Sequence, residues 1–273
     1  MGKRYGEKTG IRLAGLARWI ERKSMYQFFV PPENIRGNRV VISGEDVNHI
    51  KNVLRMREGE EISVSNGEDG KEYRCGILEL GEEIICELRF IKEDGVELPS
   101  KITLFQGLPK ADKMELIVQK AVELGVYEVV PVSMKRCVVK LDEKKQKSRI
   151  LRWQSIAEAA AKQCKRSIIP QVSTVMSFKQ ALAYAKEMDI VLVPYEMAED
   201  MPKTREIISS VKPGQRIGFF IGPEGGFDEA EIEEALKGGA VPITLGKRIL
   251  RTETAGLTVL SILMYQLEGR DIE

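Results

Sequence analysis

The most informative part of this 273-residue chain is a pair of glycine-containing segments, Ile221-Gly222-Pro223-Glu224-Gly225-Gly226-Phe227 and Leu245-Gly246-Lys247-Arg248-Ile249-Leu250-Arg251-Thr252-Glu253-Thr254-Ala255. Each segment follows a short apolar run. Glycine at the end of a strand lets the backbone approach a ligand, because it has no Cβ. Open α/β sheets bind small molecules beyond the carboxyl ends of their strands. The two segments therefore predict a backbone-lined pocket with Arg248 and Arg251 beside it.

The chain around these segments alternates strands and helices, which is typical of α/β architecture. Expected strands are 102–106, 129–132, 190–194, 217–221 and 243–245. Asp112 with Glu115, and Asp228 with Glu231, have the spacing of capping boxes at helix starts, and Thr252 is expected to cap the last helix. The glycine loop therefore precedes a helix N-terminus, where free N–H groups favour negative charge.

The region before residue 98 has a different pattern. Short apolar runs at 26–30, 39–43, 61–65, 73–80 and 84–91 are separated by turn signals, and one helix is expected at 45–54. Many short strands closed by tight turns favour a small β-barrel. We expect an N-terminal extension of uncertain status at 1–24, a barrel at 25–97 and an α/β domain at 98–273.

Bulk composition excludes several classes of protein. No apolar run approaches the ~18 residues of a membrane span. The four cysteines form no C-x-x-C pair, and with a single histidine there is no metal-ligand cluster. We expect a cytoplasmic protein with reduced thiols, no metal and no membrane segment.

The net charge of +1 hides a segregation of charge along the chain. Residues 98–187 carry 17 cationic and 8 acidic side chains, whereas residues 25–97 carry 9 and 16. A basic block predicts a face that binds a polyanion, although solvated lysines on helix surfaces are the alternative. The cations expected to contact such a polyanion are Lys110, Lys113, Arg152, Lys162, Lys165 and Arg166. Trp153 lies on an apolar helical stripe and is expected in the core.

The spacing of Gly222, Gly225 and Gly226 leaves two readings open. The loop is either part of a cofactor site or a tight turn between a strand and a helix. It matches neither a P-loop nor the dinucleotide fingerprint, so neither ATP nor NAD is indicated.

The two glycine segments resemble those of the ribosomal RNA small subunit methyltransferase E family of the SPOUT superfamily. Three further stretches support the resemblance, HIKNVLRMREGE (49–60), LPKADKMELIVQKAVELGV (108–126) and RWQSIAEAAAKQCKRSIIP (152–170). It extends from Met25 to the C-terminus. The resemblance implies a SPOUT-type α/β domain with a C-terminal trefoil knot, preceded by a PUA-like barrel. It also implies a homodimer that uses S-adenosylmethionine to methylate N3 of a uridine in the 16S rRNA of the small ribosomal subunit.

The resemblance also implies which residues form the site. Cofactor contacts are expected from three loops, at Leu192, Val193, Pro194 and Glu196, at Gly222, Pro223, Glu224, Gly225 and Gly226, and at Leu245, Gly246, Ile249, Leu250, Thr252 and Ala255. The polyanion is then RNA, which His49, Arg55 and Arg57 are expected to meet together with the six cations of the basic block. Arg248 and Arg251 are candidates to stabilise a uridine anion. Glu253 either takes the N3 proton or has a structural or capping role.

Two other functions stay open at this point. One is a SPOUT methyltransferase that acts on another RNA, such as tRNA. The other is an RNA-binding protein without catalytic activity.

Overall fold

The computed structural model describes residues 25–93, 95–195 and 200–268, and the chain divides into two compact units between Gly95 and Val96. The expected extension at 1–24 lies outside the described residues. Within the described ranges, the longest apolar helix falls short of what a membrane crossing requires.

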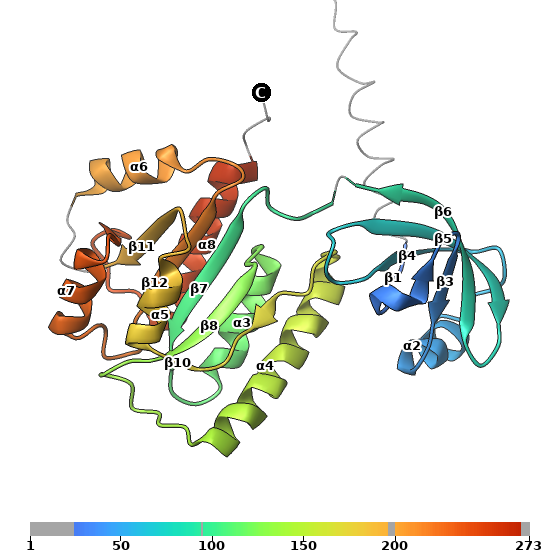
Figure 1. The fold of residues 1–273 in the computed structure, drawn as a ribbon, viewed down its shortest axis with the longest axis horizontal. Helices are drawn as coiled ribbons and strands as arrows, with labels where there is room; N and C mark the ends of the chain where they lie inside the picture. The colour runs from blue at the N-terminus through green and yellow to red at the C-terminus, as the bar shows by residue number, and fades with distance from the viewer. Residues whose placement is uncertain (1–24, 94, 196–199, 269–273) are drawn as a thin grey trace, which may run out of the picture. The chain divides into compact units, whose positions relative to one another are not determined.

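The first unit is a curled six-stranded sheet (Figure 1). Its strands are β1 (Gln27–Phe29), β2 (Ile35–Arg36), β3 (Arg39–Ile42), β4 (Glu61–Ser65), β5 (Glu72–Leu80) and β6 (Ile84–Lys92), in the order β1-β4-β5-β6-β3-β2. The short helices are η1 (Pro32–Asn34), α2 (Glu45–Asn48) and η2 (His49–Val53). The five predicted strands are present. The predicted helix at 45–54 is one turn of α-helix that widens into a π-helix.

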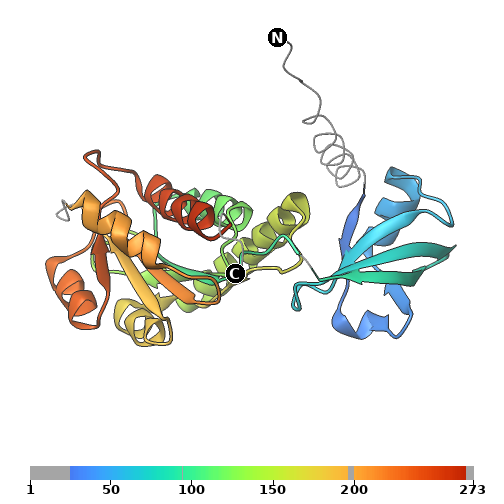
Figure 2. The same ribbon diagram turned by 90° about the horizontal axis from the view of Figure 1, so that it is seen from above.

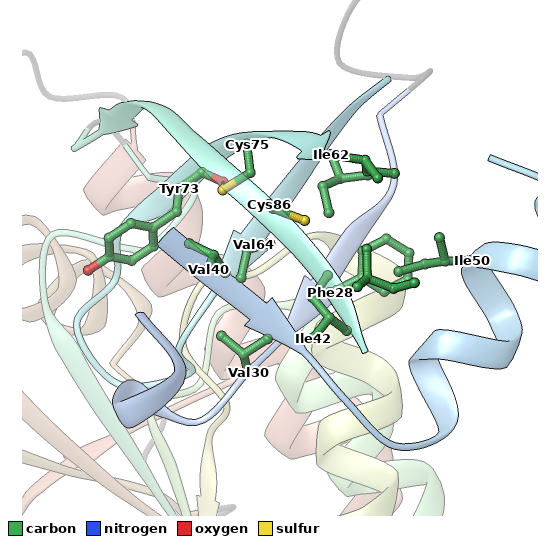
Figure 3. Packing of buried hydrophobic residues seen from close by; sticks show 12 residues of the cluster. Phe28, Val30, Val40, Ile42, Ile50, Ile62, Val64, Tyr73, Cys75 and Cys86 are labelled. Atoms are coloured by element: carbon green, nitrogen blue, oxygen red, sulfur yellow. Dashed lines mark hydrogen bonds between the residues drawn. The ribbon is translucent and has the colours of Figure 1, made fainter. Parts of the chain in front are cut away.

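The core of the first unit comes from strand residues that alternate in and out of the sheet. Val40 and Ile42, one repeat apart on β3, point inward with Ile62 and Val64 of β4 (Figure 3). Strand side chains have a period of two, so alternate residues share one face. All four are fully buried, and each stabilises the unit by roughly 1.5–3 kcal/mol relative to exposure.

The second unit is built on a seven-stranded sheet in which every pairing is parallel. Its strands are β7 (Lys101–Gly107), β8 (Glu128–Ser133), β9 (Gln171–Val172), β10 (Met176–Ser177), β11 (Ile190–Pro194), β12 (Arg216–Ile221) and β13 (Val241–Ile243). The order is β10-β8-β7-β12-β11-β13, with β9 paired to β8. The predicted α/β architecture is confirmed. The last strand starts two residues before the predicted 243–245.

Helices cover both faces of this sheet, as is required for a buried parallel sheet. They are α3 (Lys113–Glu123), α4 (Glu143–Cys164), α5 (Phe178–Ala185), α6 (Met201–Ser210), α7 (Glu229–Lys237) and α8 (Thr252–Glu268). Helices α3, α4 and α8 pack together on one face, and α5 and α7 lie on the other (Figure 2). Trp153 of α4 is buried, as predicted.

The predicted helix caps have different outcomes. Asp228 and Glu231 form the predicted capping box at the start of α7. The predicted box of Asp112 and Glu115 is wrong. Asp112 has φ −92° and ψ 14°, not the extended conformation of a typical N-cap. Its carboxylate instead lies 3.6 Å from Arg149.

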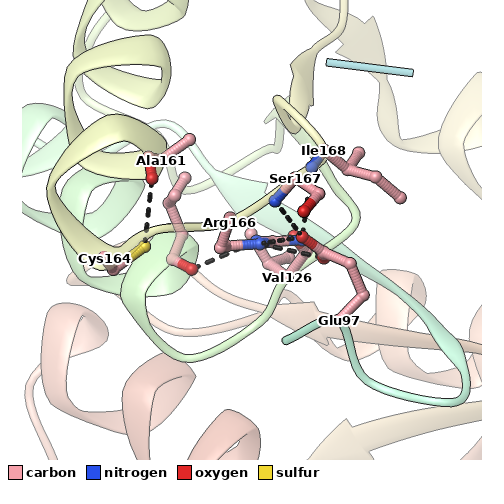
Figure 4. Close-up of polar contacts among 8 residues, drawn as sticks. Glu97, Val126, Ala161, Cys164, Arg166, Ser167 and Ile168 are labelled. Atoms are coloured by element: carbon pink, nitrogen blue, oxygen red, sulfur yellow. Dashed lines mark hydrogen bonds and ion pairs between the residues drawn. The ribbon is translucent and has the colours of Figure 1, made fainter. Parts of the chain in front are cut away.

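One charged cluster of the second unit is buried around Arg166 (Figure 4). The guanidinium of Arg166 donates to the Glu97 carboxylate at 2.6 Å and to the carbonyl of Val126 at 2.6 Å. The other Glu97 oxygen accepts from the backbone N–H groups of Ser167 and Ile168. Arg166 is only 4% exposed. The expected RNA contact of Arg166 is therefore corrected to a structural role, because its side chain is enclosed and its donors are used.

Candidate active site

The three predicted cofactor loops follow three neighbouring parallel strands. In the sheet, β11 lies between β12 and β13, so all three strands end at the same edge. The described residues of the three loops, 192–195, 222–226 and 245–255, leave from that edge. Two of them are directly joined, because the Thr252 hydroxyl donates to the Gly222 carbonyl at 2.7 Å. The sheet order therefore brings together segments whose outer residues, 192 and 255, are 63 residues apart in sequence.

The strand residues of the first loop offer mainly backbone to this edge. Leu192 and Val193 are fully buried, so their side chains face the interior of the protein. Pro194 ends β11 and is half-buried. Glu196 lies outside the described residues.

The glycines of the loops are required for different reasons. A Cβ on Gly222 would lie 3.1 Å from the Gly226 carbonyl carbon and 3.2 Å from the Phe227 nitrogen. The tight turn itself therefore needs Gly222. Gly226 and Gly246 have φ of +67° and +100°, and a Cβ on either would meet open space. These two leave room for another molecule to approach the backbone.

Gln106, at the end of β7, is a site residue that the sequence analysis missed. Its side chain is fully buried, and its Nε2 donates to the Thr252 hydroxyl at 2.9 Å. The Thr252 hydroxyl in turn donates to the Gly222 carbonyl, so one chain of hydrogen bonds joins β7, α8 and the glycine loop. Thr252 was predicted to cap the last helix with its hydroxyl. It is instead the first residue of α8, and its hydroxyl bonds to Gln106 and Gly222. Gln106 Oε1 has no hydrogen-bond partner among the described residues.

A second link between the loops runs through Lys113. Its Nζ lies 3.2 Å from Glu224 of the glycine loop and 3.3 Å from Glu253 of α8. Glu224 also accepts from the Lys110 backbone N–H at 3.0 Å. The hydrogen bond to Glu224 raises the pKa of Lys113 above its ordinary 10.5. Desolvation on burial would raise the pKa of Glu224, but the Lys110 and Lys113 donors outweigh it and lower the pKa below 4.5.

The two candidate arginines differ from Arg166 in exposure and in pairing. Arg248 and Arg251 are exposed, and neither guanidinium pairs with a side chain in the part of the chain that the structure describes. Ile249 between them is 89% exposed. Two unpaired cations beside the loops are available to a negatively charged or electron-rich substrate.

The remaining predicted RNA contacts are dispersed. His49, Arg55 and Arg57 are exposed on and after η2 in the first unit. In the second unit Lys110 is exposed, Arg152 pairs with Glu115 at 3.0 Å, and Lys162 and Lys165 lie at the C-terminal end of α4.

The segment that joins β8 to α4 also contacts the glycine loop, and the sequence analysis did not identify it. Arg136 donates to the Gly225 carbonyl at 3.2 Å. Lys135 lies 2.8 Å from Asp228, and its backbone N–H donates to Glu231. The only signal in the sequence is a high density of cations from residue 135 to residue 149.

A search of the described residues for a metal centre finds no group of three or more histidine, cysteine, aspartate or glutamate side chains suited to one. The four cysteines are free thiols, and burial raises the pKa of Cys75 and Cys86 to about 12.

Comparison with known proteins places this geometry in a family. The model of an RNA methyltransferase domain matches residues 96–264, and that of an RNA methyltransferase PUA domain matches residues 42–91. The chain is 41% identical over 231 residues to a Bacillus subtilis protein named ribosomal RNA small subunit methyltransferase E. That match covers 83% of this chain and 90% of the relative.

Two solved structures resemble the chain over most of its length. One is a ribosomal RNA small subunit methyltransferase E from Neisseria gonorrhoeae bound to S-adenosyl methionine, with 32% identity and a TM-score of 0.74, covering 88% of this chain and 97% of that one. The other, with the same values, is a putative methyltransferase from Legionella pneumophila in complex with the cofactor SAM. The predicted fold class, a SPOUT-type α/β domain preceded by a PUA-like domain, is confirmed.

Proposed function

The chain belongs to the ribosomal RNA small subunit methyltransferase E family, and from that premise we propose that it transfers the methyl group of S-adenosylmethionine to N3 of a uridine in 16S rRNA. The observation that carries the proposal is that three loops leave one edge of the sheet, with Arg248 and Arg251 beside them and without an ion-pair partner among the described residues. The proposed setting is the cytoplasm, where the RNA of the small subunit is the substrate.

The loops suit a cofactor held mainly by backbone groups. An adenosine is uncharged and needs shaped donors and acceptors more than ion pairs. Open space at the Cβ positions of Gly226 and Gly246 supports such an approach. The two relatives solved with S-adenosylmethionine support the identity of the cofactor. When bound, it supplies an electrophilic methyl group.

The arginines suit the acceptor. Uridine N3 is a weak acid and becomes nucleophilic when its proton leaves and negative charge spreads to O2 and O4. A guanidinium near those oxygens stabilises the anion and lowers the barrier. We assign this role to Arg248 or Arg251, because neither has a competing carboxylate partner among the residues that the structure describes.

Glu253 is better suited to a structural role than to that of the base. Its Oε2 lies 3.3 Å from Lys113, and its side chain is only 23% exposed. Taking up the N3 proton at this oxygen would break the ion pair with Lys113. We therefore propose that the N3 proton leaves to solvent, while Glu253 holds the start of α8 in register with Lys113.

The proposal includes a homodimer. A groove beside Glu253 is lined by apolar side chains of α3, α6 and α8, among them Leu116, Ile208 and Leu257. Tyr265 at this groove is 83% exposed. A second copy packed on this face would cover it and stand next to the site. Tyr265→Glu should give monomers in size-exclusion chromatography with light scattering, whereas Leu236→Glu on α7 should not.

The test of the reaction is a map of reverse-transcription stops on 16S rRNA after incubation with enzyme and S-adenosylmethionine. A methyl group at N3 removes the Watson–Crick donor and halts the polymerase, so one new stop at a uridine is expected. A parallel assay with a tritiated methyl donor compares small subunits with tRNA. Label in tRNA alone would point to a different acceptor.

Calorimetric titration with S-adenosylmethionine separates an enzyme from a binding protein. Saturable heat is expected for the wild-type chain. Absence of binding, together with intact RNA affinity, would favour a non-catalytic RNA-binding protein.

A further inference from the structure

We infer that residues 135–149 form a basic edge that binds the phosphate backbone of the RNA next to the target nucleotide. The inference rests on the proposed function and extends it to residues that no motif identifies. The basic edge comprises nearly all of the β8–α4 connection and the first two turns of α4, a run in the lower part of Figure 1.

Much of the positive charge in this segment is not neutralised within the described part of the protein. Between residues 135 and 149 the chain has seven cationic and two acidic side chains. Some of the cations are paired, for example Lys145 with Asp142 and Arg149 with Asp112. Lys140, Lys144 and Lys147 are exposed and make no ion pair with any residue of the described ranges. Three unpaired ammonium groups within eight residues attract a polyanion.

The segment also lies next to the glycine loop. Arg136 and Lys135 attach this segment to the glycine loop and to Asp228 at the start of α7. A Cβ on Gly225 would lie 3.2 Å from the Cβ of Arg136, so the two segments are in close contact. RNA held along the basic edge therefore passes beside the loop that is proposed to hold the methyl donor.

The β8–α4 connection is held in place by hydrogen bonds at its start. The backbone N–H of Met134 donates to the Cys137 thiol at 3.3 Å, and the N–H of Cys137 donates to the Met134 carbonyl at 3.1 Å. Both side chains are buried, while Val138 next to them is 68% exposed. A fixed turn presents its cations with little loss of backbone entropy on binding.

The arrangement of α4 extends the edge. Lys144, Lys147 and Leu151 recur at helical spacing and share one side of the helix. Leu151 is 73% exposed. Ammonium groups suit phosphates, and an apolar side chain next to them suits the face of a sugar or base. This composition fits RNA backbone better than it fits an acidic peptide. An acidic peptide would have no reason to bind next to the glycine loop, whereas the RNA substrate has to reach it.

The experiment compares two triple variants with the same change of charge. Lys140→Gln, Lys144→Gln and Lys147→Gln together alter the basic edge. Lys179→Gln, Lys186→Gln and Lys203→Gln together serve as the control, because these exposed lysines lie on α5, after α5 and on α6. Affinity for transcribed 16S rRNA is measured from about 50 to 400 mM salt. The slope of log affinity against log salt should fall by about 2 in the first variant, at about 0.7 per lost phosphate contact on single strands, and be unchanged in the control.

The outcomes separate this inference from the proposed function. Equal slopes for the two triple variants, with wild-type methyl transfer intact, would overturn the basic edge alone. Failure of the wild-type protein to bind or methylate rRNA would overturn the proposed function as well. Melting temperatures of both variants should match the wild type, since all six side chains are exposed. A lower melting temperature shared by both would leave the difference between their slopes as the deciding measurement.

Discussion

Two clusters of charged side chains in the second unit have similar components and different settings. The Glu97–Arg166 cluster is largely buried, with side chains 16% and 5% accessible, and hydrogen bonds satisfy both of its partners. The cluster of Lys113, Glu224 and Glu253 is half-exposed at the candidate site, with side chains 22–29% accessible. The first ties the start of the unit to the end of α4. The second ties the glycine loop to the start of α8.

Burial decides how strongly an ion pair affects the stability of the fold. A buried charge that loses its partner keeps the full cost of desolvation, so breaking such a pair strongly destabilises the fold. A half-exposed pair is screened by solvent and contributes little to stability. Its value lies in the geometry that it imposes on the loops. We therefore expect stability to report on the first cluster and cofactor binding to report on the second.

The largest expected effect is on the buried cluster. Arg166→Gln leaves the Glu97 carboxylate, whose side chain is only 16% accessible, without its countercharge. The free energy of unfolding should fall by about 3 kcal/mol, the lower end for a buried pair, because Glu97 is not fully enclosed. Urea denaturation followed by circular dichroism measures it. Arg152→Gln is the control, because that arginine pairs with Glu115 on the surface and should shift the midpoint little. Equal shifts in the two variants would contradict the comparison.

The two clusters also mark what the sequence could and could not predict. Short apolar or alternating runs predicted the strands of both units, because the side chains that a strand buries set the period and length of the run. The Asp228 box was predictable because both partners lie within four residues. Arg166 and Lys113 were both read as surface cations, since a count of charges contains no information about which carboxylate folds back onto each.

Long-range contacts of single polar residues were the hardest to predict. Gln106 lies in an apolar strand, and its partner Thr252 is 146 residues away. The amide has no local pattern that distinguishes it from an ordinary core polar group. The trefoil knot followed only from the family resemblance, because general rules of topology disfavour knots. The glycine loop was predictable as a turn, but only the strand order shows which other loops join it.

The next effect tests the hydrogen-bond chain beside the second cluster. Gln106→Met keeps the volume of the side chain but removes the donor to Thr252. We expect affinity for S-adenosylmethionine to fall about tenfold, which corresponds to 1.4 kcal/mol, with a loss of unfolding free energy of about 1 kcal/mol. Titration calorimetry and urea denaturation measure the two. Gln119→Met on the exposed side of α3 is the control. A change in stability without a change in affinity would make Gln106 a core residue only.

A smaller effect is expected for the cation of the second cluster. Lys113→Met should weaken S-adenosylmethionine binding by roughly threefold, the scale of a half-exposed ion pair, and leave the urea midpoint unchanged. Lys120→Met on the same helix removes a cation whose partner is Glu123 at 2.8 Å. It should change neither quantity. A midpoint shift as large as that of Arg166→Gln would show that the two clusters do not differ in the way proposed.

The smallest effect is the pH dependence of the second cluster. The folded-state pKa of Glu224 is lowered, so its contribution is present above the ordinary value of 4.5 and is lost as the pH falls through the lower folded value. The folded-state pKa of Lys113 is raised, so its contribution is complete below 10.5 and is lost only as the pH rises through the higher value. The difference in S-adenosylmethionine affinity between wild type and Lys113→Met should therefore be flat between about pH 6 and pH 9. It should shrink below about pH 4, if the protein is still folded there by circular dichroism.

In a Glu224→Gln background the effect of Lys113→Met should be smaller at neutral pH, because one of the two carboxylates that engage the ammonium is gone. A difference that changes steadily between pH 6 and pH 9 would mean that another group controls the loops.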